Sequence, residues 1–340
     1  MEPAAGLTPL AFTAPQRAAR RERLREDLGQ KDRLDPRRRA ALEGLAHALA
    51  PDSMDRALPA RELLAHDLEG RGGPTAAVCA GDPATATHLT WMVSGMGIRP
   101  DTALWGAAHE AAQLAAAQHA AGAPRPVVVA WLRYPAPAPW RVVLDRPARK
   151  AGRQLADDVA AWWAHLHASG LRARGTAVHG AVDAHSYGSL VAGHALRELD
   201  ERGLLPADPA ATDPTPHSAE RPVETLVVSG AVGLPLALLS GARALGAATG
   251  RVFEARAPGD VLSLLGRVGG LRQAWPGAVA LPVDPVPGME GAAVRGHDTS
   301  RWTPAAGDDA PRGYRDPGSV TLAAAARVTA GQPLGLQRLR

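Results

Sequence analysis

Ser186 lies in the stretch of this sequence that is best suited to covalent chemistry. The segment Ala184-His185-Ser186-Tyr187-Gly188 follows an apolar β-type run and precedes a helical run. A serine with a small residue two positions before it and two positions after it fits the sharp strand-to-helix turn that exposes a nucleophilic hydroxyl. Ala184 stands where this motif often has glycine, and alanine still meets the steric requirement. An ordinary turn with a capping serine is the alternative interpretation.

A serine nucleophile needs a base and an acid that orients the base. Where such a turn carries the serine, the acid and then the histidine follow it along the chain. Asp260 fits the acid because it follows a late β-type run, and Asp284, after the next run, is its rival. His297 fits the base, since it follows both acids and precedes the last helical run. A turn aspartate and a surface histidine are the alternative interpretations.

Two early glycines predict where the oxyanion of the reaction would be held. Gly95 and Gly97 flank Met96 directly after a β-type run, and glycine lets the backbone pass close to the nucleophile. We therefore expect the N–H groups of Met96 and Tyr187 to form the oxyanion hole. A dinucleotide-binding loop is excluded, because the third glycine of that motif would fall on Pro100.

Residues after another β-type run are candidates for contact with the substrate. Arg133 and Tyr134 follow residues 126–132 and should lie at the same edge of the sheet as the serine. We expect them to bind substrate together with Gly95 and Gly97. For the neighbouring Trp131, core packing is at least as good an interpretation.

We expect neither a metal nor a cofactor. His165 and His167 are two positions apart on a predicted helix and therefore face different directions. Cys79 is the single cysteine, which excludes an intrachain disulfide and a zinc site built on several cysteines. A Ser–His–Asp mechanism is complete with side chains and backbone donors alone.

The elements that must position these residues alternate between β-type and helical runs from about residue 75 onward. The β-type runs are residues 76–79, 89–93, 126–132, 176–182, 223–228, 251–255 and 278–283. The helical runs are residues 102–119, 151–168, 189–201, 236–247 and 320–329, and residues 206–221 and 303–316 are predicted loops. This alternation predicts an α/β protein, an α/β-hydrolase fold with a mainly parallel central sheet and helices on both faces.

Residues 1–67 are predicted to form a helical, Arg-rich N-terminal extension, and residues 68–340 the α/β-hydrolase domain. Asp35-Pro36 is a helix start, and no β-type signal precedes residue 68. Acidic residues interrupt the arginines of residues 16–39, so we interpret them as a solvated helical face with ion pairs. Docking of this face on nucleic acid or anionic lipid is the alternative, and we expect no nucleic acid partner because no aromatic residues interleave for stacking.

Charge and hydropathy set further expectations. The formal net charge is +4, and the positive residues are nearly all arginine. The sequence begins without a basic segment followed by an apolar run, and it has no uncharged apolar stretch of about 20 residues. These features predict a cytoplasmic protein without a membrane span; the oligomeric state is left open.

Taken together, these motifs resemble a family of bacterial α/β-hydrolases long known as a domain of unknown function. The resemblance covers residues 58–331. Its markers are residues 76–83, 93–97, 130–134, 185–189, 257–260, 296–297 and 314–319. It implies a Ser–His–Asp hydrolase with Ser186, Asp260 and His297 as the triad, and it does not define a substrate.

The sequence therefore predicts a serine hydrolase that acts on a small-molecule carboxylic ester or thioester through an acyl-enzyme. Ser186 would attack the carbonyl, His297 would accept its proton, and Asp260 would orient His297. Residues 229–250 are too short for a large lid, which favours a small esterase over a lipase with a mobile cap. The alternative is a catalytically silent binding protein on the same fold.

Overall fold

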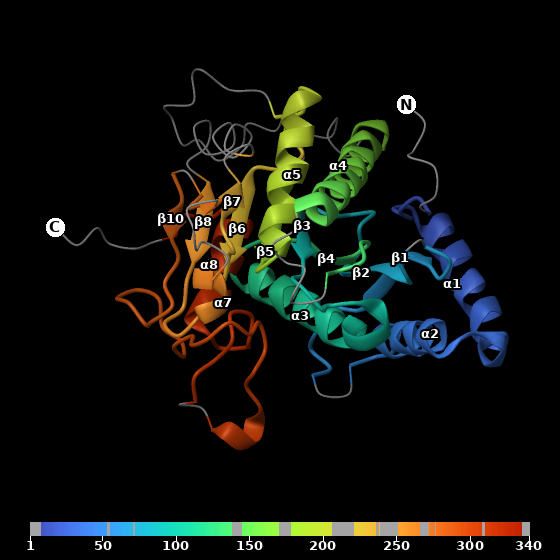
Figure 1. Ribbon diagram of the computed structural model, residues 1–340, viewed down its shortest axis with the longest axis horizontal. Helices are drawn as coiled ribbons and strands as arrows, with labels where there is room; N and C mark the ends of the chain where they lie inside the picture. Colours follow the sequence, from blue (N-terminus) through green and yellow to red (C-terminus); the bar gives the residue numbers. More distant parts are fainter. Residues whose placement is uncertain are drawn as a thin grey trace.

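The computed structural model describes residues 8–52, 55–70, 72–137, 145–169, 178–205, 221–235, 238, 251–265, 272–275, 277–307 and 310–334. An eight-stranded sheet runs through the molecule in the order β1-β2-β4-β3-β5-β6-β8-β10 (Figure 1). Its strands are β1 (Arg61–Asp67), β2 (Thr75–Ala80), β3 (His88–Val93), β4 (Pro126–Leu132), β5 (His179–His185), β6 (Thr225–Ser229), β8 (Val252–Ala255) and β10 (Val279–Ala280). A separate two-stranded sheet pairs β7 (Leu234–Pro235) with β9 (Arg272–Gln273).

Helices cover both faces of this sheet. They are α1 (Ala14–Gly29), α2 (Pro36–Leu49), α3 (Pro100–Ala120), α4 (Asp145–Ala168), α5 (Gly188–Glu201), α7 (Val261–Leu265) and α8 (Val320–Thr329). Helices α4 and α5 pack together on one face, and α2, α3 and α8 pack on the other (Figure 1). Neighbouring residues of β3 serve the two faces: Trp91 packs with Trp162 of α4, whereas Met92 packs with Leu104 of α3. The predicted α/β-hydrolase fold is confirmed.

Strand direction explains why the candidate residues can meet. Pairing is parallel from β4 through β3, β5, β6 and β8 to β10. Among the described strands of this sheet, β2 runs antiparallel to both of its neighbours, β1 and β4. The carboxyl ends of β3, β5 and β8 therefore lie at one edge, where ligands bind in open α/β sheets. The segments that carry Met96, Ser186 and Asp260 leave the sheet at this edge.

Each predicted β-type run overlaps an observed strand, and the helical runs 102–119, 151–168, 189–201 and 320–329 are also confirmed. The predicted helix 236–247 and the predicted loop 206–221 lie outside the described residues, apart from Leu238 and Arg221. Strand β5 extends three residues past the predicted end because its pairing with β6 continues to His185.

The N-terminal region differs from the prediction. Residues 61–67 were expected to be helical, but they form β1, which pairs antiparallel with β2. The segment is rich in Glu, Leu and Ala, which favour helices, and cross-strand pairing with burial of Leu63 and Leu64 overrides that preference. Leu24 of α1 and Leu42 of α2 share one apolar cluster with the sheet, so the boundary expected after residue 67 falls within a common core.

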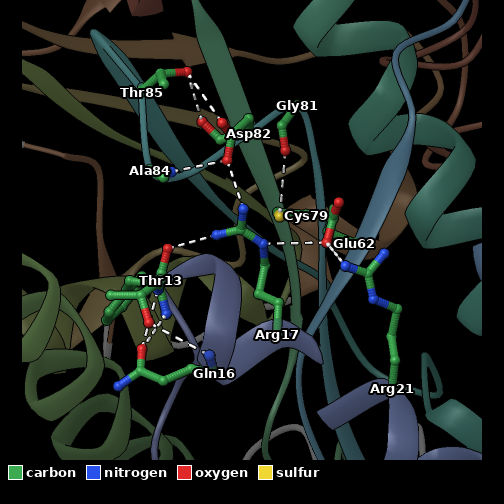
Figure 2. Close-up of polar contacts among 11 residues, drawn as sticks. Thr13, Gln16, Arg17, Arg21, Glu62, Cys79, Gly81, Asp82, Ala84 and Thr85 are labelled. Atoms are coloured by element: carbon green, nitrogen blue, oxygen red, sulfur yellow. Dashed lines mark hydrogen bonds and ion pairs between the residues drawn. The ribbon is translucent and has the colours of Figure 1, made fainter. Parts of the chain in front are cut away.

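Arg17 anchors α1 to the edge of the sheet (Figure 2). Its buried guanidinium donates from Nε to Glu62 Oε2 at 3.1 Å and from Nη2 to Asp82 Oδ1 at 2.8 Å. Arg21 also pairs with Glu62, and Arg23 pairs with Asp27 of its own helix. The expected ion pairs among the N-terminal arginines are therefore present. No helix in the described ranges is long and apolar enough to cross a membrane.

Candidate active site

The turn between β5 and α5 holds Ser186 in a strained conformation. Its φ is 54°, the one left-handed φ of a non-glycine residue among the described residues. Such a conformation costs about 1–3 kcal/mol and persists only where the surroundings enforce it. A Cβ on Gly188 would lie 2.5 Å from Val93 O, so α5 can approach β3 only because this position is glycine. Packing of α5 against β3 therefore requires the small residue that we expect two positions after Ser186, which is Gly188.

The structure brings Ser186, His297 and Asp260 into one hydrogen-bonded chain. His297 Nε2 lies 2.8 Å from Ser186 Oγ, and His297 Nδ1 lies 2.7 Å from Asp260 Oδ1. A carboxylate oxygen only accepts, so Nδ1–H donates to Asp260. Nε2 of the neutral ring is then free to accept a proton from the serine hydroxyl.

Asp260 is held as a carboxylate by further donors. Ser263 N donates to Oδ1 at 3.0 Å, and the Tyr314 hydroxyl donates to Oδ2 at 2.8 Å. Burial alone would raise the pKa of Asp260, but the hydrogen bonds from His297, Ser263 and Tyr314 outweigh burial and lower it. The rival acid, Asp284, pairs with Arg295 at the surface instead.

His185 contributes a contact that the sequence did not predict. Its Nε2–H donates to the backbone oxygen of His297 at 2.8 Å, and the two ring centroids are 4.7 Å apart. Burial, followed by the proximity of His297 and Arg315, lowers the pKa of His185 well below its ordinary value. The ring is therefore neutral and holds the backbone of the histidine that faces the serine.

A cavity of about 380 Å³ opens above Ser186. One wall is mainly apolar and consists of Met96, Ile98, Ala103, Gly106, Ala107 and Leu262. A polar wall adjoins it, since Glu110 lies one turn along α3 from Gly106 and Ala107. The polar wall consists of Glu110, Asp298, Thr299, Ser300 and Arg315. Ligand pockets in proteins span about 300–1,000 Å³, so this one suits a small substrate.

The loop after β3 packs closely against Ser186 through Gly95. A Cβ on Gly95 would lie 2.8 Å from Ser186 Cβ and 3.4 Å from Ser186 Oγ, so a larger residue would displace the nucleophile. Gly95 and Met96 line the cavity, whereas Gly97 turns the chain with a φ of 74° and does not line it. Tyr187 directly precedes the first residue of α5, and its side chain is buried.

Arg133 and Tyr134 were expected at the substrate site, but neither lines the cavity at Ser186. Arg133 is buried and turns toward α4, where its Nε lies 3.0 Å from the carboxylate of Asp158, beside a separate cavity. The Tyr134 hydroxyl donates to Ser94 O at 2.6 Å, so it supports the loop that carries Gly95 from behind. The ion pair with Asp158 compensates the charge of the buried guanidinium, and the bond to Ser94 O satisfies the buried hydroxyl.

No group of three or more His, Cys, Asp or Glu side chains within the described ranges is arranged to hold a metal ion. Cys79 is buried in β2, and burial raises the pKa of its thiol.

The family of the chain follows from comparison with known proteins. A family model described as alpha/beta hydrolase matches residues 69–269, which include β2 through β8, the serine turn and Asp260. The chain belongs to the alpha/beta hydrolase family. No curated protein matches the chain.

Solved structures of esterases share limited similarity with the chain. An esterase from Pyrobaculum calidifontis is 15% identical, with 76% of this chain and 83% of that chain covered and a TM-score of 0.31. The esterase LipW from Mycobacterium marinum is 15% identical, with 95% and 90% covered and a TM-score of 0.34. Fungal esterases from Rhizomucor miehei are 16% identical, with 77% and 83% covered and a TM-score of 0.31. Similarity at this level does not assign an activity or a substrate.

Proposed function

We propose that this protein is a serine hydrolase that cleaves a carboxylic ester or thioester through an acyl-enzyme intermediate. The observation that carries the proposal is the hydrogen-bonded chain from Ser186 through His297 to Asp260 at the base of a cavity. Family membership supports hydrolase chemistry but does not assign roles to residues.

The acylation step uses the side chains in the order of their hydrogen bonds. Ser186 Oγ attacks the carbonyl carbon while His297 Nε2 takes its proton, and the resulting imidazolium is stabilised by Asp260. His297 then returns this proton to the leaving alcohol or thiol as the tetrahedral intermediate collapses. In the second half, His297 takes a proton from water, which attacks the acyl-enzyme carbonyl. The bond to Ser186 Oγ then breaks, His297 returns the proton to Oγ, and the acid is released.

Backbone N–H groups would stabilise the negative oxygen of the tetrahedral intermediate. We assign this role to Met96 and Tyr187, because the loop of Gly95 contacts Ser186 and Tyr187 lies at the start of α5. Tyr134 supports this arrangement through its bond to Ser94 O, which fixes the loop behind the proposed donors.

The cavity indicates what part of a substrate would bind where. Ala103, Gly106 and Ala107 form a row of small residues on α3, and a Cβ on Gly106 would meet nothing within 4 Å. This wall leaves room for an apolar acyl chain, whereas the charges of Glu110 and Arg315 in the polar wall compensate each other. A neutral ester with a short acyl chain fits this combination best.

A fluorophosphonate probe, which reacts with activated serines, tests the proposal. Wild type and Ser169→Ala, an exposed serine on the far end of α4, should be labelled, and Ser186→Ala should not. A panel of p-nitrophenyl esters from acetate to octanoate would then measure the acyl length that the cavity accepts. Absence of labelling and of ester hydrolysis in folded wild type would favour the catalytically silent binding protein.

A further inference from the structure

The segment that carries His297 has no helix or strand of its own to hold it. Residues 297–302 form irregular chain, and residues 297–300 line the cavity. A displacement of about 1 Å at a reacting group can cost about 100-fold in rate, so the segment must be fixed by contacts from outside. Its contacts therefore indicate which residues position the base.

Several backbone contacts come from the C-terminal part of the chain. Tyr314 N donates to Asp298 O at 3.0 Å, and Arg315 N donates to Thr299 O at 2.8 Å. The Asp316 carboxylate accepts from Trp302 N at 2.9 Å. These bonds fix the outer side of the segment, away from the loop that follows β3.

Glu110 of α3 holds the same segment through the side chains of Thr299 and Ser300. Glu110 Oε1 accepts from Thr299 Oγ1 at 2.7 Å and from Ser300 Oγ at 2.8 Å. The carboxylate is buried, and its second oxygen accepts from Arg315 Nη1 at 3.3 Å. Three of its roughly four acceptor positions are thus taken by groups of the polar wall, so Glu110 is suited to structure and not to binding a substrate.

Arg315 keeps this buried carboxylate compensated. Its guanidinium, also buried, pairs with Glu110 on one side and with Asp183 of β5 on the other. Burial lowers the pKa of Arg315, but the two carboxylates outweigh burial and raise it, so the guanidinium stays charged. The cluster joins α3, β5 and the segment of His297.

We infer that Glu110 is a positioning residue that sets His297 against Ser186 through the hydroxyls of Thr299 and Ser300. The helix that carries Glu110 begins at Pro100, directly after the loop of Gly95 and Met96. Glu110 therefore ties the proposed base to the element that follows the proposed oxyanion loop. This inference rests on the proposed hydrolase function.

The test removes the two hydroxyls that Glu110 holds. The double variant Thr299→Val/Ser300→Ala should lose about 10- to 100-fold in kcat, with KM changed less than about threefold, because the base is displaced and the apolar wall is intact. The rate of fluorophosphonate labelling of Ser186 should fall by the same factor. The single variant Thr299→Ser, with Ser300 intact, keeps both hydroxyls. Its kcat should therefore be close to that of wild type.

Non-additivity separates positioning from general damage. Glu110→Ala should lower kcat on its own, and adding it to the double variant should cost less than about twofold more, because both changes remove the bonds between Glu110 and the two hydroxyls. Thr85→Val is the matched control: this exposed threonine hydroxyl also faces a carboxylate, that of Asp82 at 3.4 Å (Figure 2), and should leave kcat unchanged. Thermal melts of each variant would check that the fold is kept. If the double variant does not fold, the single variants Thr299→Val and Ser300→Ala would be measured in its place.

The outcomes distinguish this inference from the proposal on which it rests. If wild type is neither labelled nor active, the hydrolase function itself is wrong. If wild type is labelled and active while the folded double variant keeps its kcat and labelling rate, Glu110 does not position the base, and the hydrolase function stands. Additive losses for Glu110→Ala and the double variant would also overturn the inference.

Discussion

Replacing Tyr314 with phenylalanine removes one hydroxyl that makes two buried hydrogen bonds. The hydroxyl donates to Asp260 Oδ2 at 2.8 Å and accepts from Ala257 N at 2.8 Å. A hydrogen bond to a charged group contributes about 1.5–3 kcal/mol, and a buried N–H left without a partner costs about 1–3 kcal/mol. Since neighbouring losses do not simply add, we expect Tyr314→Phe to lower the free energy of unfolding by about 3 kcal/mol at pH 7.

The pH dependence of this loss follows from the lowered pKa of Asp260. A carboxyl whose folded pKa is lowered adds stability above its unfolded pKa of about 3.9, and that stability disappears as the pH falls through the folded pKa. The Tyr314 hydroxyl is one of the donors that lower the pKa. The difference in the free energy of unfolding between wild type and Tyr314→Phe should therefore be constant from pH 8 to pH 5. It should shrink below about pH 4.

Urea unfolding at several pH values would measure this difference, with Tyr134→Phe as the control. Tyr134 is also a buried tyrosine, but its hydroxyl donates to a backbone oxygen, Ser94 O, at 2.6 Å. Tyr134→Phe should cost about 1–3 kcal/mol with no change across the same pH range. A Tyr314→Phe loss that is equally large at pH 3.5 and pH 7 would refute the reasoning about the carboxylate.

Further predictions concern the acid, the cavity and the turn. Asp260→Asn should lower kcat by about 10⁴-fold, because the histidine loses the partner that fixes its tautomer, whereas Asp284→Asn should leave it unchanged; ester hydrolysis measures both. Gly106→Leu fills open space in the cavity and should lower kcat/KM for octanoate at least about tenfold relative to acetate, and equal losses would contradict this role. Ser186→Gly should be about 1 kcal/mol more stable to urea than Ser186→Ala, because glycine tolerates the φ of 54°; equal stability would mean that the turn is unstrained.

The sequence could predict the parts of the site that local chemistry dictates. The turn around Ser186 requires small neighbours wherever the chain folds, so it is visible as a pattern of residues. Chain order then selected Asp260 and His297, since a parallel sheet places the ends of successive strands at one edge. The choice between Asp260 and Asp284 could not be made from order alone. The structure distinguishes them, because Asp284 pairs with Arg295 at the surface.

The contacts that hold the site were not visible in the sequence. Glu110 is one of several polar residues on a helix, and its partners Thr299, Ser300 and Arg315 are 189, 190 and 205 residues away. Tyr314 is 54 residues from Asp260, and Arg133 carries no sign that its partner is Asp158 of α4. Each pairing depends on which faces of two elements meet, and neither periodicity nor spacing reports this. Strand β1 was missed for the same reason, since pairing with β2 overrides its helical composition.

The site combines a strained serine with buried charges, and each of these is destabilising alone. The left-handed φ of Ser186 costs about 1–3 kcal/mol, and the carboxylates of Asp260 and Glu110 are taken out of water. Donors from separate elements offset this cost: Tyr314 for Asp260, and Arg315 with the Thr299 hydroxyl for Glu110. These donors also hold Asp260 and the segment of His297, so under the proposed function the network that stabilises the charges would also set the geometry for catalysis. A substitution in this network should therefore lower stability and kcat together. Ser186→Gly, in contrast, should raise stability while abolishing kcat.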